Sequence, residues 1–357
     1  MAGLFAGALL HRAGHHVRIF ERSHRGLGGR GAGLVAQQEV FDLLDMLGLT
    51  SVAEKGIVAR ERITLDRQGS IHDSDPRPQM QVSWDHLYAA VRGLLGDDIY
   101  KTGSAIIGVN DEGSNPAIAL EDGIRVVADL VIGADGIGSV VRRALIADDP
   151  GPHYAGYVAW RALVPENVLP HATRAALSDR FAFYHMPGGQ ALGYTVAGAE
   201  GQLDPGKRRY NAVWYRRDGD LAATLVDAAG SAHLYSLPPG GVSAPARTAL
   251  VAAAQAQLPP QFAAVFAAEP APFVQAIYDM ETPFMVHGNM ALIGDAAFVA
   301  RPHTAMGVAK AAGDAMALAA AVAYGWSPIA RAQFERERLA AGRAIVAYGQ
   351  RLGVSLG

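Results

Sequence analysis

Acidic residues follow short apolar runs at several places in this sequence, an arrangement that suits ligand binding. Asp295 comes after the apolar run 290–293 and directly follows Gly294, so a buried strand and a turn are predicted there. A carboxylate at the end of a strand can accept hydrogen bonds from a sugar or polyol hydroxyl. An Ala-rich helix is predicted to begin near Gly307, and the free N–H groups of a helix start hold negative charge.

Two more acids occupy similar positions earlier in the chain. Asp135 and Gly136 follow the apolar strand predicted at 130–132 and precede a helix predicted at 139–145. Glu21 ends a strand predicted at 15–20. Each acid also has a simpler interpretation, because Asp135 and Asp295 could be turn or helix-cap residues and Glu21 an exposed acid.

Taken together, these stretches resemble the flavin motifs of the FAD-dependent aromatic hydroxylases, the single-component enzymes of the p-hydroxybenzoate hydroxylase type. Residues 294–307 resemble the second flavin motif, residues 128–142 the middle Asp-Gly motif, and residues 14–22 the strand that ends in a ribose-binding acid. The resemblance covers nearly the whole chain. The segment 154–161 is similar to the 2,6-dihydroxypyridine hydroxylase subgroup.

The resemblance implies a role for each motif at the cofactor. Glu21 is expected at the adenosine ribose, Asp135 at the phosphates or ribityl chain, and Asp295 at the ribityl hydroxyls. The loop that leads to Gly307 is expected to pass the flavin edge and to aim a helix dipole at N1 and O2. The implied FAD-binding residues are Gly3, Glu21, Arg22, Arg30, Gly31, Asp135, Gly136, Gly294, Asp295, Pro302 and Gly307.

One part of the family pattern is not found in this sequence. Gly3 falls where the third glycine of GxGxxG is expected, so the first strand and the first two glycines have no counterpart. A start placed too late, a fragment, or the loss of part of the pyrophosphate cradle would each explain this. The first two explanations are favoured, because the rest of the flavin apparatus is present.

The implied activity is that of an FAD-dependent monooxygenase. In this family NADH or NADPH reduces FAD, O2 forms a flavin C4a-hydroperoxide, and one oxygen atom passes to an electron-rich ring. A base must take the substrate hydroxyl proton. The candidate catalytic residues are His303, Arg161, His185 and Tyr157, with Tyr194 facing the same side. Simpler interpretations remain, since Arg161 and His185 could be structural and His303 could be solvent-exposed.

The pattern of predicted elements indicates an α/β fold. An FAD-binding Rossmann-like parallel sheet, its first strand missing, is expected to carry an inserted mixed or antiparallel sheet that forms a substrate domain. The FAD-binding domain is expected at 1–60, 84–150 and 281–357, and the substrate domain at 61–83 and 151–280. Aromatic, alternating strands at 157–164, 181–185, 191–196 and 211–215 support the second domain.

Composition excludes several classes of function. The 357 residues include no cysteine, which rules out disulfides and thiolate metal sites, and the histidines show no shared metal spacing. The net charge of -3 gives no reason to expect nucleic acid or an anionic membrane. The apolar run 317–323 is too short to cross a membrane, and no signal peptide is visible, so a cytoplasmic protein is expected.

Two other functions remain open at this stage. A related flavoprotein reductase or halogenase is one; a halogenase should show a lysine near the substrate, and Lys310 is the only lysine near the flavin loop. A remnant that binds no FAD is the other. The sequence does not decide between NADH and NADPH, does not specify the ring, and leaves the oligomeric state open, although relatives are commonly homodimers.

Overall fold

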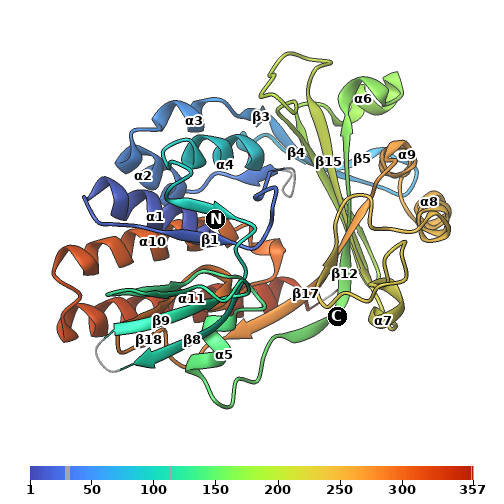
Figure 1. Ribbon diagram of the computed structural model, residues 1–357. Coiled ribbons are helices and arrows are strands. Elements are labelled where there is room, and N and C mark those ends of the chain that lie inside the picture. The colour runs from blue at the N-terminus through green and yellow to red at the C-terminus, as the bar shows by residue number, and fades with distance from the viewer. Residues whose placement is uncertain (29–32, 113–114, 355, 357) are drawn as a thin grey trace.

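The computed structural model describes residues 1–28, 33–112, 115–354 and 356. Figure 1 shows a helix-rich half on the left and a large, steep sheet on the right. The mixture of parallel and antiparallel sheets confirms the predicted α/β fold class.

Short parallel strands organise the helix-rich half. β1 (Ile19–Glu21) pairs with β7 (Tyr100–Thr102), and β11 (Val131–Gly133) pairs with β19 (Met290–Leu292), which also binds β18 (Val286–His287) antiparallel. In the part of the chain that the structure describes, no ladder joins β1 to β11. The parallel sheet therefore consists of two separate pieces.

Four helices pack around these strands. They are α1 (Ala2–Arg12), α2 (Gln38–Leu47), α10 (Gly307–Ala323) and α11 (Pro328–Leu352). α1 is rich in Ala and Leu, and eight of its residues are buried, because its small side chains allow close packing on α10. Phe5 and Leu318 are fully buried in the shared core.

The large sheet is built mainly from the second half of the chain. Its order is β16-β17-β12-β15-β14-β13-β4-β5, and every pair in this order is antiparallel except β13 with β4. The strands are β4 (Glu61–Leu65), β5 (Ile71–Asp75), β12 (His153–Pro165), β13 (Arg180–Met186), β14 (Gly189–Val196), β15 (Arg209–Arg217), β16 (Ser236–Leu237) and β17 (Phe273–Glu281).

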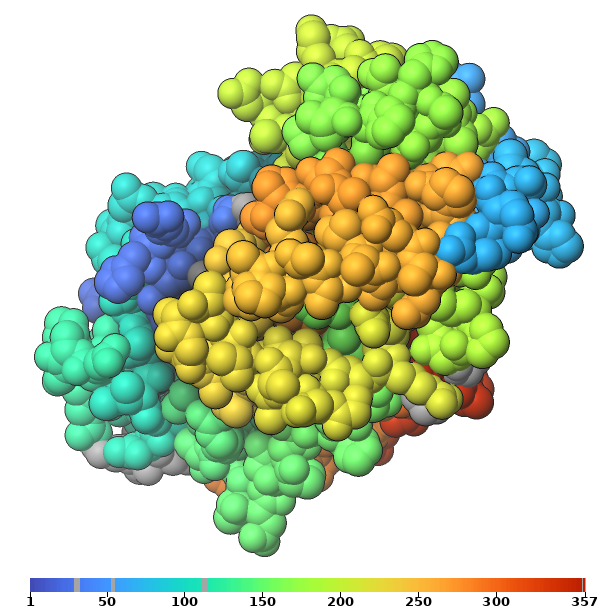
Figure 2. Space-filling view, turned by 90° about the vertical axis from the view of Figure 1, so that its right-hand side faces the viewer, coloured from blue at the N-terminus to red at the C-terminus, as the bar shows by residue number. Residues whose placement is uncertain are grey.

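Alternation along β12 gives this sheet two different faces. Val158, Trp160 and Ala162 are buried in one core with side chains of α8 (Ala244–Gln257) and α9 (Pro260–Ala268). Tyr157 and Ala159 belong to a separate buried cluster on the opposite face. We call the first the outer face and the second the inner face. Figure 2 looks onto the outer side, where the yellow and orange side chains of the segment 220–275 cover much of the sheet.

A smaller sheet connects the two halves. β2 (Gly33–Val35) and β3 (Ile57–Ala59) both pair with β6 (Gln79–Ser83), which leads directly into α4 (Trp84–Arg92). A Cβ atom on Gly33 would come within 2.4 Å of Val196 Cγ1 and 2.6 Å of Tyr194 Cε2. The Tyr194 hydroxyl donates to the Gly33 carbonyl at 2.9 Å. The backbone of β2 thus lies directly against the inner face, which only a residue without a side chain allows.

The remaining elements cover the edges. They are α3 (Thr50–Glu54), β8 (Ile106–Glu112), β9 (Asn115–Leu120), β10 (Arg125–Val127), α5 (Val140–Leu145), η1 (Glu166–Val168), α6 (His171–Leu177), α7 (Leu221–Thr224), η2 (Gly294–Ala296), β20 (Phe298–Val299) and η3 (Pro302–Thr304). None of the helices in the described ranges is both long and apolar enough to span a bilayer. The same residues contain no group of three or more side chains suited to a metal ion.

Candidate active site

The turn after β19 packs closely against the start of α1. Gly294 has a φ of 62°, and a Cβ atom there would lie 2.6 Å from the Cβ of Ala2. Gly3 makes a similar approach to Ala134, at 3.0 Å. The start of α1 therefore meets the carboxyl ends of β11 and β19 with no room for larger side chains. Close backbone approach at a helix start is what a phosphate-bearing ligand needs.

A buried arginine fixes the two strand ends to each other. Arg142 is 1% exposed, pairs with Asp149 at 2.9 Å, and donates to the carbonyls of Ala296 and Ile137 at 3.0 and 2.8 Å. Ile137 lies in the loop after β11 and Ala296 in the turn after β19. One guanidinium thus sets the spacing between the two motifs, a role that sequence reasoning did not predict.

A second buried pair holds the same turn from the other side. The Asp314 carboxylate, on α10, accepts from the Gly294 N–H at 2.9 Å and from Arg338 Nε at 2.7 Å. Asp314 is 2% exposed. Arg338 compensates the negative charge of Asp314, and the Gly294 N–H donates to the other carboxylate oxygen. Protein groups alone therefore hold the turn in place.

Asp295 points its carboxylate away from these supports. Its side chain is 57% exposed and, within the described ranges, accepts a hydrogen bond from Lys310 Nζ at 3.2 Å. Lys310 is 1% exposed and also donates to the Phe298 carbonyl at 2.7 Å. The lysine therefore orients Asp295 and leaves carboxylate lone pairs open for hydroxyl donors. Lys310, weighed above as the lysine that a halogenase would need, is thus engaged with Asp295 and the Phe298 carbonyl.

The start of α10 offers unpaired backbone donors. Its N-cap, Met306, makes no side-chain cap, and within the described ranges no acceptor takes the N–H groups of Gly307, Val308 and Ala309. A Cβ atom on Gly307 would meet nothing within 4 Å, so the space beside it is open. This fits the expected contact with a polarised ring edge.

The other predicted cofactor residues lie around these groups. The carboxylates of Asp295 and Glu21 both raise the pKa of the Met1 amine, which burial lowers more strongly, so both acids lie near the start of α1. Glu21 accepts from the Ser23 N–H at 2.8 Å, and Arg22 beside it is exposed. Arg30 and Gly31 lie outside the described residues.

The Asp135 carboxylate accepts hydrogen bonds from residues that follow it closely in the chain. Its carboxylate accepts from Ser139 Oγ at 2.5 Å and from the N–H groups of Val140 and Val141 at 2.6 and 3.3 Å. It caps α5, while Gly136 adopts a φ of 78° in the turn before it. The geometry therefore shows the helix-cap role directly, and contact with a cofactor phosphate stays a prediction.

On the substrate side, an imidazole and a phenol meet across the two halves. His303, in η3, lies with Nε2 2.9 Å from the Tyr157 hydroxyl oxygen of β12. Its ring also packs on Tyr215, with centroids 4.1 Å apart. Burial, and then the charges of Arg301 and Arg161, lower the pKa of His303 to about 4. His303 is therefore neutral near pH 7 and has a free lone pair.

An ion pair supports this contact from behind. Arg301 donates to both carboxylate oxygens of Asp279, at 2.8–3.1 Å, and its guanidinium carbon lies 5.6 Å from the centre of the Tyr157 ring. Burial raises the pKa of the Tyr157 phenol, so Tyr157 is neutral. Sequence reasoning missed Arg301, Asp279 and Tyr215. In the sequence, only the adjacency of Arg301 to Pro302 and His303 could have indicated that it belongs to the site.

Arg161 lies on the same inner face. It pairs in register with Val213 of β15 and Phe273 of β17 and is half-buried. Among the described residues no hydrogen bond or ion pair involves its side chain. Its positive charge adds to the effects of burial and Arg301 that lower the pKa of His303. At Tyr215 it opposes the larger effect of burial, which raises the pKa of the phenol.

The other two candidates lie further out. Tyr194 is buried and uses its hydroxyl on Gly33. His185 is exposed, stacks on Phe183 with centroids 6.1 Å apart, and contacts Gln190 at 3.3 Å. The structure thus brings His303, Tyr157 and Arg161 to one region and puts His185 at its rim.

The end of α11 closes the inner face. A Cβ atom on Gly353 would lie 2.5 Å from Arg301 Nη1 and 3.0 Å from the Tyr157 hydroxyl. Leu356 is 3% exposed and packs with Tyr157, Ala159 and Val213. These contacts exclude water from the side of Tyr157 that faces away from His303.

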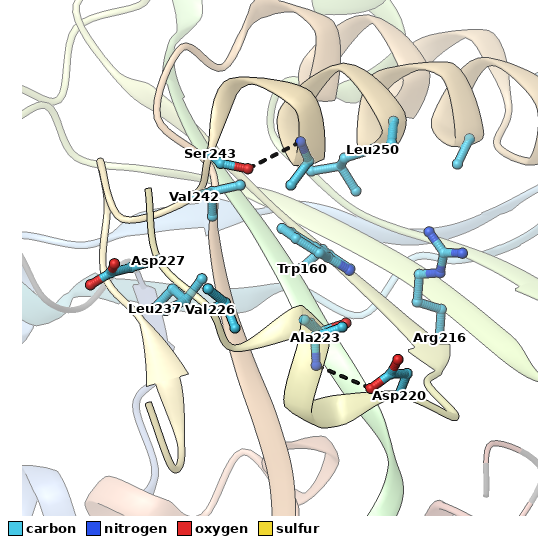
Figure 3. A pocket seen from close by; sticks show the side chains of 14 residues that line it. Trp160, Arg216, Asp220, Ala223, Val226, Asp227, Leu237, Val242, Ser243 and Leu250 are labelled. Atoms are coloured by element: carbon cyan, nitrogen blue, oxygen red, sulfur yellow. Dashed lines mark hydrogen bonds between the residues drawn. The ribbon is translucent and has the colours of Figure 1, made fainter. Parts of the chain in front are cut away.

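A cavity of about 460 Å³ lies on the outer face instead. Figure 3 shows Trp160 and Arg216 reaching into it from the sheet, below the first turns of α8 and above α7. Asp220 and Ser243, drawn with dashed bonds, cap these two helices. It contains none of the predicted site residues, so it is separate from the region around His303.

Comparison with known proteins agrees with this geometry. The family profile described as FAD binding domain matches residues 1–188, and a second, described as FAD binding domain-like, matches residues 154–279. The chain is 32% identical to 2,6-dihydroxypyridine 3-monooxygenase of Paenarthrobacter nicotinovorans over 331 residues, which cover 89% of this chain and 80% of that protein.

Solved structures show the same fold. That of 2,6-dihydroxypyridine-3-hydroxylase from Arthrobacter nicotinovorans superimposes with a TM-score of 0.91 at 28% identity, over 99% of this chain and 90% of that one. Klebsiella pneumoniae HpxO, solved with FAD and uric acid, does so with a TM-score of 0.78 at 21% identity, over 100% of this chain and 86% of that one. The chain therefore belongs to the FAD-dependent aromatic hydroxylases and is a monooxygenase with FAD as cofactor and NAD(P)H as co-substrate.

Proposed function

We propose that this monooxygenase hydroxylates a small hydroxy-N-heterocyclic or phenolic ring, held between the start of α10 and the inner face of the large sheet. The observation that carries the proposal is the contact between His303 and Tyr157, which joins the flavin-side loop to that face. The substrate named for the Paenarthrobacter relative, 2,6-dihydroxypyridine, is a ring of this class. Overall, a ring C–H, O2, NAD(P)H and a proton become a ring C–OH, water and NAD(P)+.

The cofactor-side residues bind FAD and orient it. Asp295, held by Lys310, accepts from ribityl hydroxyls, and Glu21 with Arg22 binds the adenosine ribose. Gly3 and Gly294 let the backbone approach the pyrophosphate, and Asp135 with Gly136 positions α5 beside it. Gly307 and the loop at Pro302 contact the ring edge. Arg30 and Gly31 keep the flavin-side role that the family resemblance implies.

When bound, FAD would supply the oxidation of NADH or NADPH and the activation of O2 for transfer of one oxygen atom. The protein supplies the proton handling. With its proton on Nε2, neutral His303 donates to the Tyr157 oxygen and leaves Nδ1 to accept the ring hydroxyl proton, which makes the ring a better nucleophile. Tyr157 is a positioning residue, since it is fully buried and acts through the imidazole. His185 lies at the rim of this region.

Several broader expectations belong to the same proposal. The FAD-binding domain comprises 1–60, 84–150 and 281–357, and the substrate domain 61–83 and 151–280; pairing of β4 with β13 supports this division. A homodimer in the cytoplasm is the expected form. Tyr215, Leu356 and the end of α11 keep water from the reacting groups, which limits loss of oxygen as peroxide.

The test uses the purified full chain. A flavin absorbance spectrum measures cofactor content, and NAD(P)H oxidation is followed with 2,6-dihydroxypyridine, phenol and no ring. We expect a yellow protein whose NAD(P)H oxidation rises with one ring and yields one hydroxylated product per NAD(P)H. Bound flavin with no ring-stimulated oxidation by either class of ring would refute the substrate class but leave the cofactor assignment intact.

A further inference from the structure

The cavity on the outer face of the large sheet contains polar groups that the proposed reaction does not use. Its volume of about 460 Å³ lies within the range of roughly 300–1,000 Å³ that is usual for small-molecule sites. The register of β12 and β15 pairs Arg216 with Val158 and Trp160 with Trp214. Trp160 and Arg216 are therefore diagonal neighbours on one face of the sheet, and both reach into the cavity (Figure 3).

Small side chains on α8 leave this space open. Ala246, Ala249 and Ala253 follow one another at helical spacing along the side of α8 that lines the cavity. Alanine fills little of the distance between a helix and a sheet, so room remains between α8 and the Trp160 ring. The other apolar walls come from Leu237, Val242 and Leu250. The cavity thus offers a flat apolar surface with space for a ring system.

The indole N–H of Trp160 has no acceptor within the described ranges. Trp160 is 8% exposed, and no described residue accepts a hydrogen bond from its nitrogen. Figure 3 shows this nitrogen at the end of the ring nearer to Arg216. A buried indole N–H usually has a partner, because leaving it unpaired costs free energy. An acceptor atom on a bound molecule would provide that partner.

Arg216 likewise has unused donors. Its guanidinium carbon lies 4.8 Å from the centre of the Trp214 ring, a contact that orients the group without using its N–H bonds. Among the described residues none forms a hydrogen bond or an ion pair with it. Arg216 is half-buried, so solvent screens its charge only in part. An anion beside it would stabilise this charge.

Two acids also line the cavity, but they are engaged in the loops that contain them. Asp220 caps α7 by accepting from the Ala223 N–H at 3.1 Å. Asp227 accepts three hydrogen bonds within its own loop, one of them from His233 Nε2 at 2.7 Å. In the part of the chain that the structure describes, neither acid forms an ion pair with Arg216. The guanidinium therefore stays available to a ligand.

A second hollow, of about 410 Å³, meets the first at Arg216. It is lined by residues 186–189, Arg216, Arg217 and Gln257. Gln257 ends α8, whereas Ser243 at the start of α8 lines the first cavity. The two hollows therefore follow α8 along its length, with an apolar part at its start and a polar part at its end. Arg216 lies where the two parts join.

We propose that the outer cavity is a binding site for a small amphipathic carboxylate with a flat apolar body. The body lies on Trp160 beneath α8, and the carboxylate accepts from the Arg216 guanidinium and the Trp160 N–H. A planar guanidinium suits a carboxylate because two parallel N–H bonds can reach its two oxygens. The site is independent of the proposed function, since Tyr157 lies on the opposite face of the sheet.

The experiment uses the flavin-loaded full chain and three probes without a ring hydroxyl. They are 2-naphthoate, its neutral counterpart 2-naphthamide, and acetate, which has the charge without the body. Isothermal titration calorimetry measures binding without turnover. We expect 2-naphthoate to bind at least tenfold more tightly than 2-naphthamide. Acetate should give no heat of binding at the concentrations that saturate the chain with 2-naphthoate.

Two variants test the location of the site. Arg216→Gln should weaken 2-naphthoate at least tenfold and change 2-naphthamide less than twofold, because only the charged contact is lost. Ala249→Leu should weaken both rings at least tenfold, because the larger side chain fills the space above Trp160. Ala252→Leu is the matched control, since Ala252 is exposed on the same helix and lies outside the cavity lining. It should bind both rings like the wild type.

Four outcomes would overturn the proposal. They are no binding of 2-naphthoate to the wild type, equal affinities of the wild type for 2-naphthoate and 2-naphthamide, and unchanged 2-naphthoate affinity in Arg216→Gln or in Ala249→Leu. Unchanged affinity in Ala249→Leu would mean that the ring binds elsewhere, for example on the inner face. Ala249 is exposed and leucine is a good helix former, so this variant decides even if Arg216→Gln is misfolded by thermal unfolding and flavin content.

Discussion

The Tyr157 hydroxyl oxygen lies 2.9 Å from Nε2 of His303, and this contact joins β12 of the large sheet to the loop before α10. Replacing His303 by Gln should lower the hydroxylation kcat roughly 100-fold, because the proton acceptor is removed. Tyr157→Phe should lower kcat about 10-fold with little change in KM, because the imidazole loses its orienting partner. Steady-state kinetics with product quantification measures both.

The pH profile separates these two roles. Tyr157→Phe should shift the acidic limb of kcat, whereas a purely structural role would leave its position unchanged. Tyr324→Phe is a suitable control, since Tyr324 is 81% exposed. Wild-type turnover in His303→Gln would show that another group takes the proton.

The lowered pKa of His303 has a consequence for stability. Its pKa falls from an ordinary value near 6.5 to about 4 in the folded protein, so the unfolded chain binds more protons between these values. Stability contributed by the neutral imidazole is present above about pH 6.5 and is lost as the pH falls toward 4, by at most about 3 kcal/mol. Urea unfolding across this range should show a steeper decline in wild type than in His303→Gln. His287→Gln, at an exposed position, should follow the wild type.

Asp295 should control flavin affinity. Asp295→Ala removes an exposed carboxylate that is held in place by Lys310, so FAD should bind about 10-fold more weakly, the effect of one charged hydrogen bond. Flavin released on dilution, followed by fluorescence, gives the dissociation constant. Asp148→Asn, an exposed acid outside the site, is the control. Equal affinity of Asp295→Ala and the wild type for FAD would show that Asp295 does not contact the cofactor.

Arg142 should matter for stability more than any exposed arginine. Arg142→Met leaves the Asp149 carboxylate, with a side chain only 10% exposed, without its cation, and the free energy of unfolding should fall by roughly 3 kcal/mol. Chemical denaturation measures it. Arg143 is an exposed neighbour that donates to the Gly138 carbonyl, and Arg143→Met should change the free energy of unfolding by less than about 0.5 kcal/mol.

The contact of β2 with the inner face leaves no space for a methyl group. Gly33→Ala would bring a Cβ atom to 2.4 Å from Val196, and the resulting shift should lower stability by about 1–3 kcal/mol. Gly219→Ala, where a Cβ atom meets nothing within 4 Å, should be nearly neutral. Thermal unfolding of the two variants gives the comparison, and equal stabilities would mean that the junction adjusts.

Local patterns predicted several elements closely. The Ala-rich run 244–257 predicts a helix, and α8 occupies these residues, because Ser243 caps it and a proline occupies its first turn. The small residues of 1–13 predict a helix and the Gln-Gly turn within 63–72 predicts a hairpin, and both elements are present. The strand predicted at 15–20 is shorter, because only Ile19–Glu21 pairs with β7. Helix α9 was missed, as its apolar residues show no clear polar stripe.

Within the site, the predictable part was the backbone pattern. Gly294, Asp295 and Gly307 could be identified from a strand, turn and helix that adjoin in sequence. Arg142 with Ala296 and Arg301 with Asp279 could not, because each pair joins elements that are distant in the chain and meet only on folding. The three hydrogen bonds that the Asp135 carboxylate accepts likewise depend on how the loop between β11 and α5 bends, which the sequence does not specify.

The supports of Arg142 and Asp314 bear on how the cofactor is acquired. The hydrogen bonds of Arg142 and of Asp314 in the turn after β19 are made with other protein groups. The proposed cofactor site therefore has its shape before FAD binds. Little conformational entropy is then lost on loading. We therefore expect apoprotein stripped of its yellow colour to take up FAD again on simple mixing, without an unfolding and refolding step.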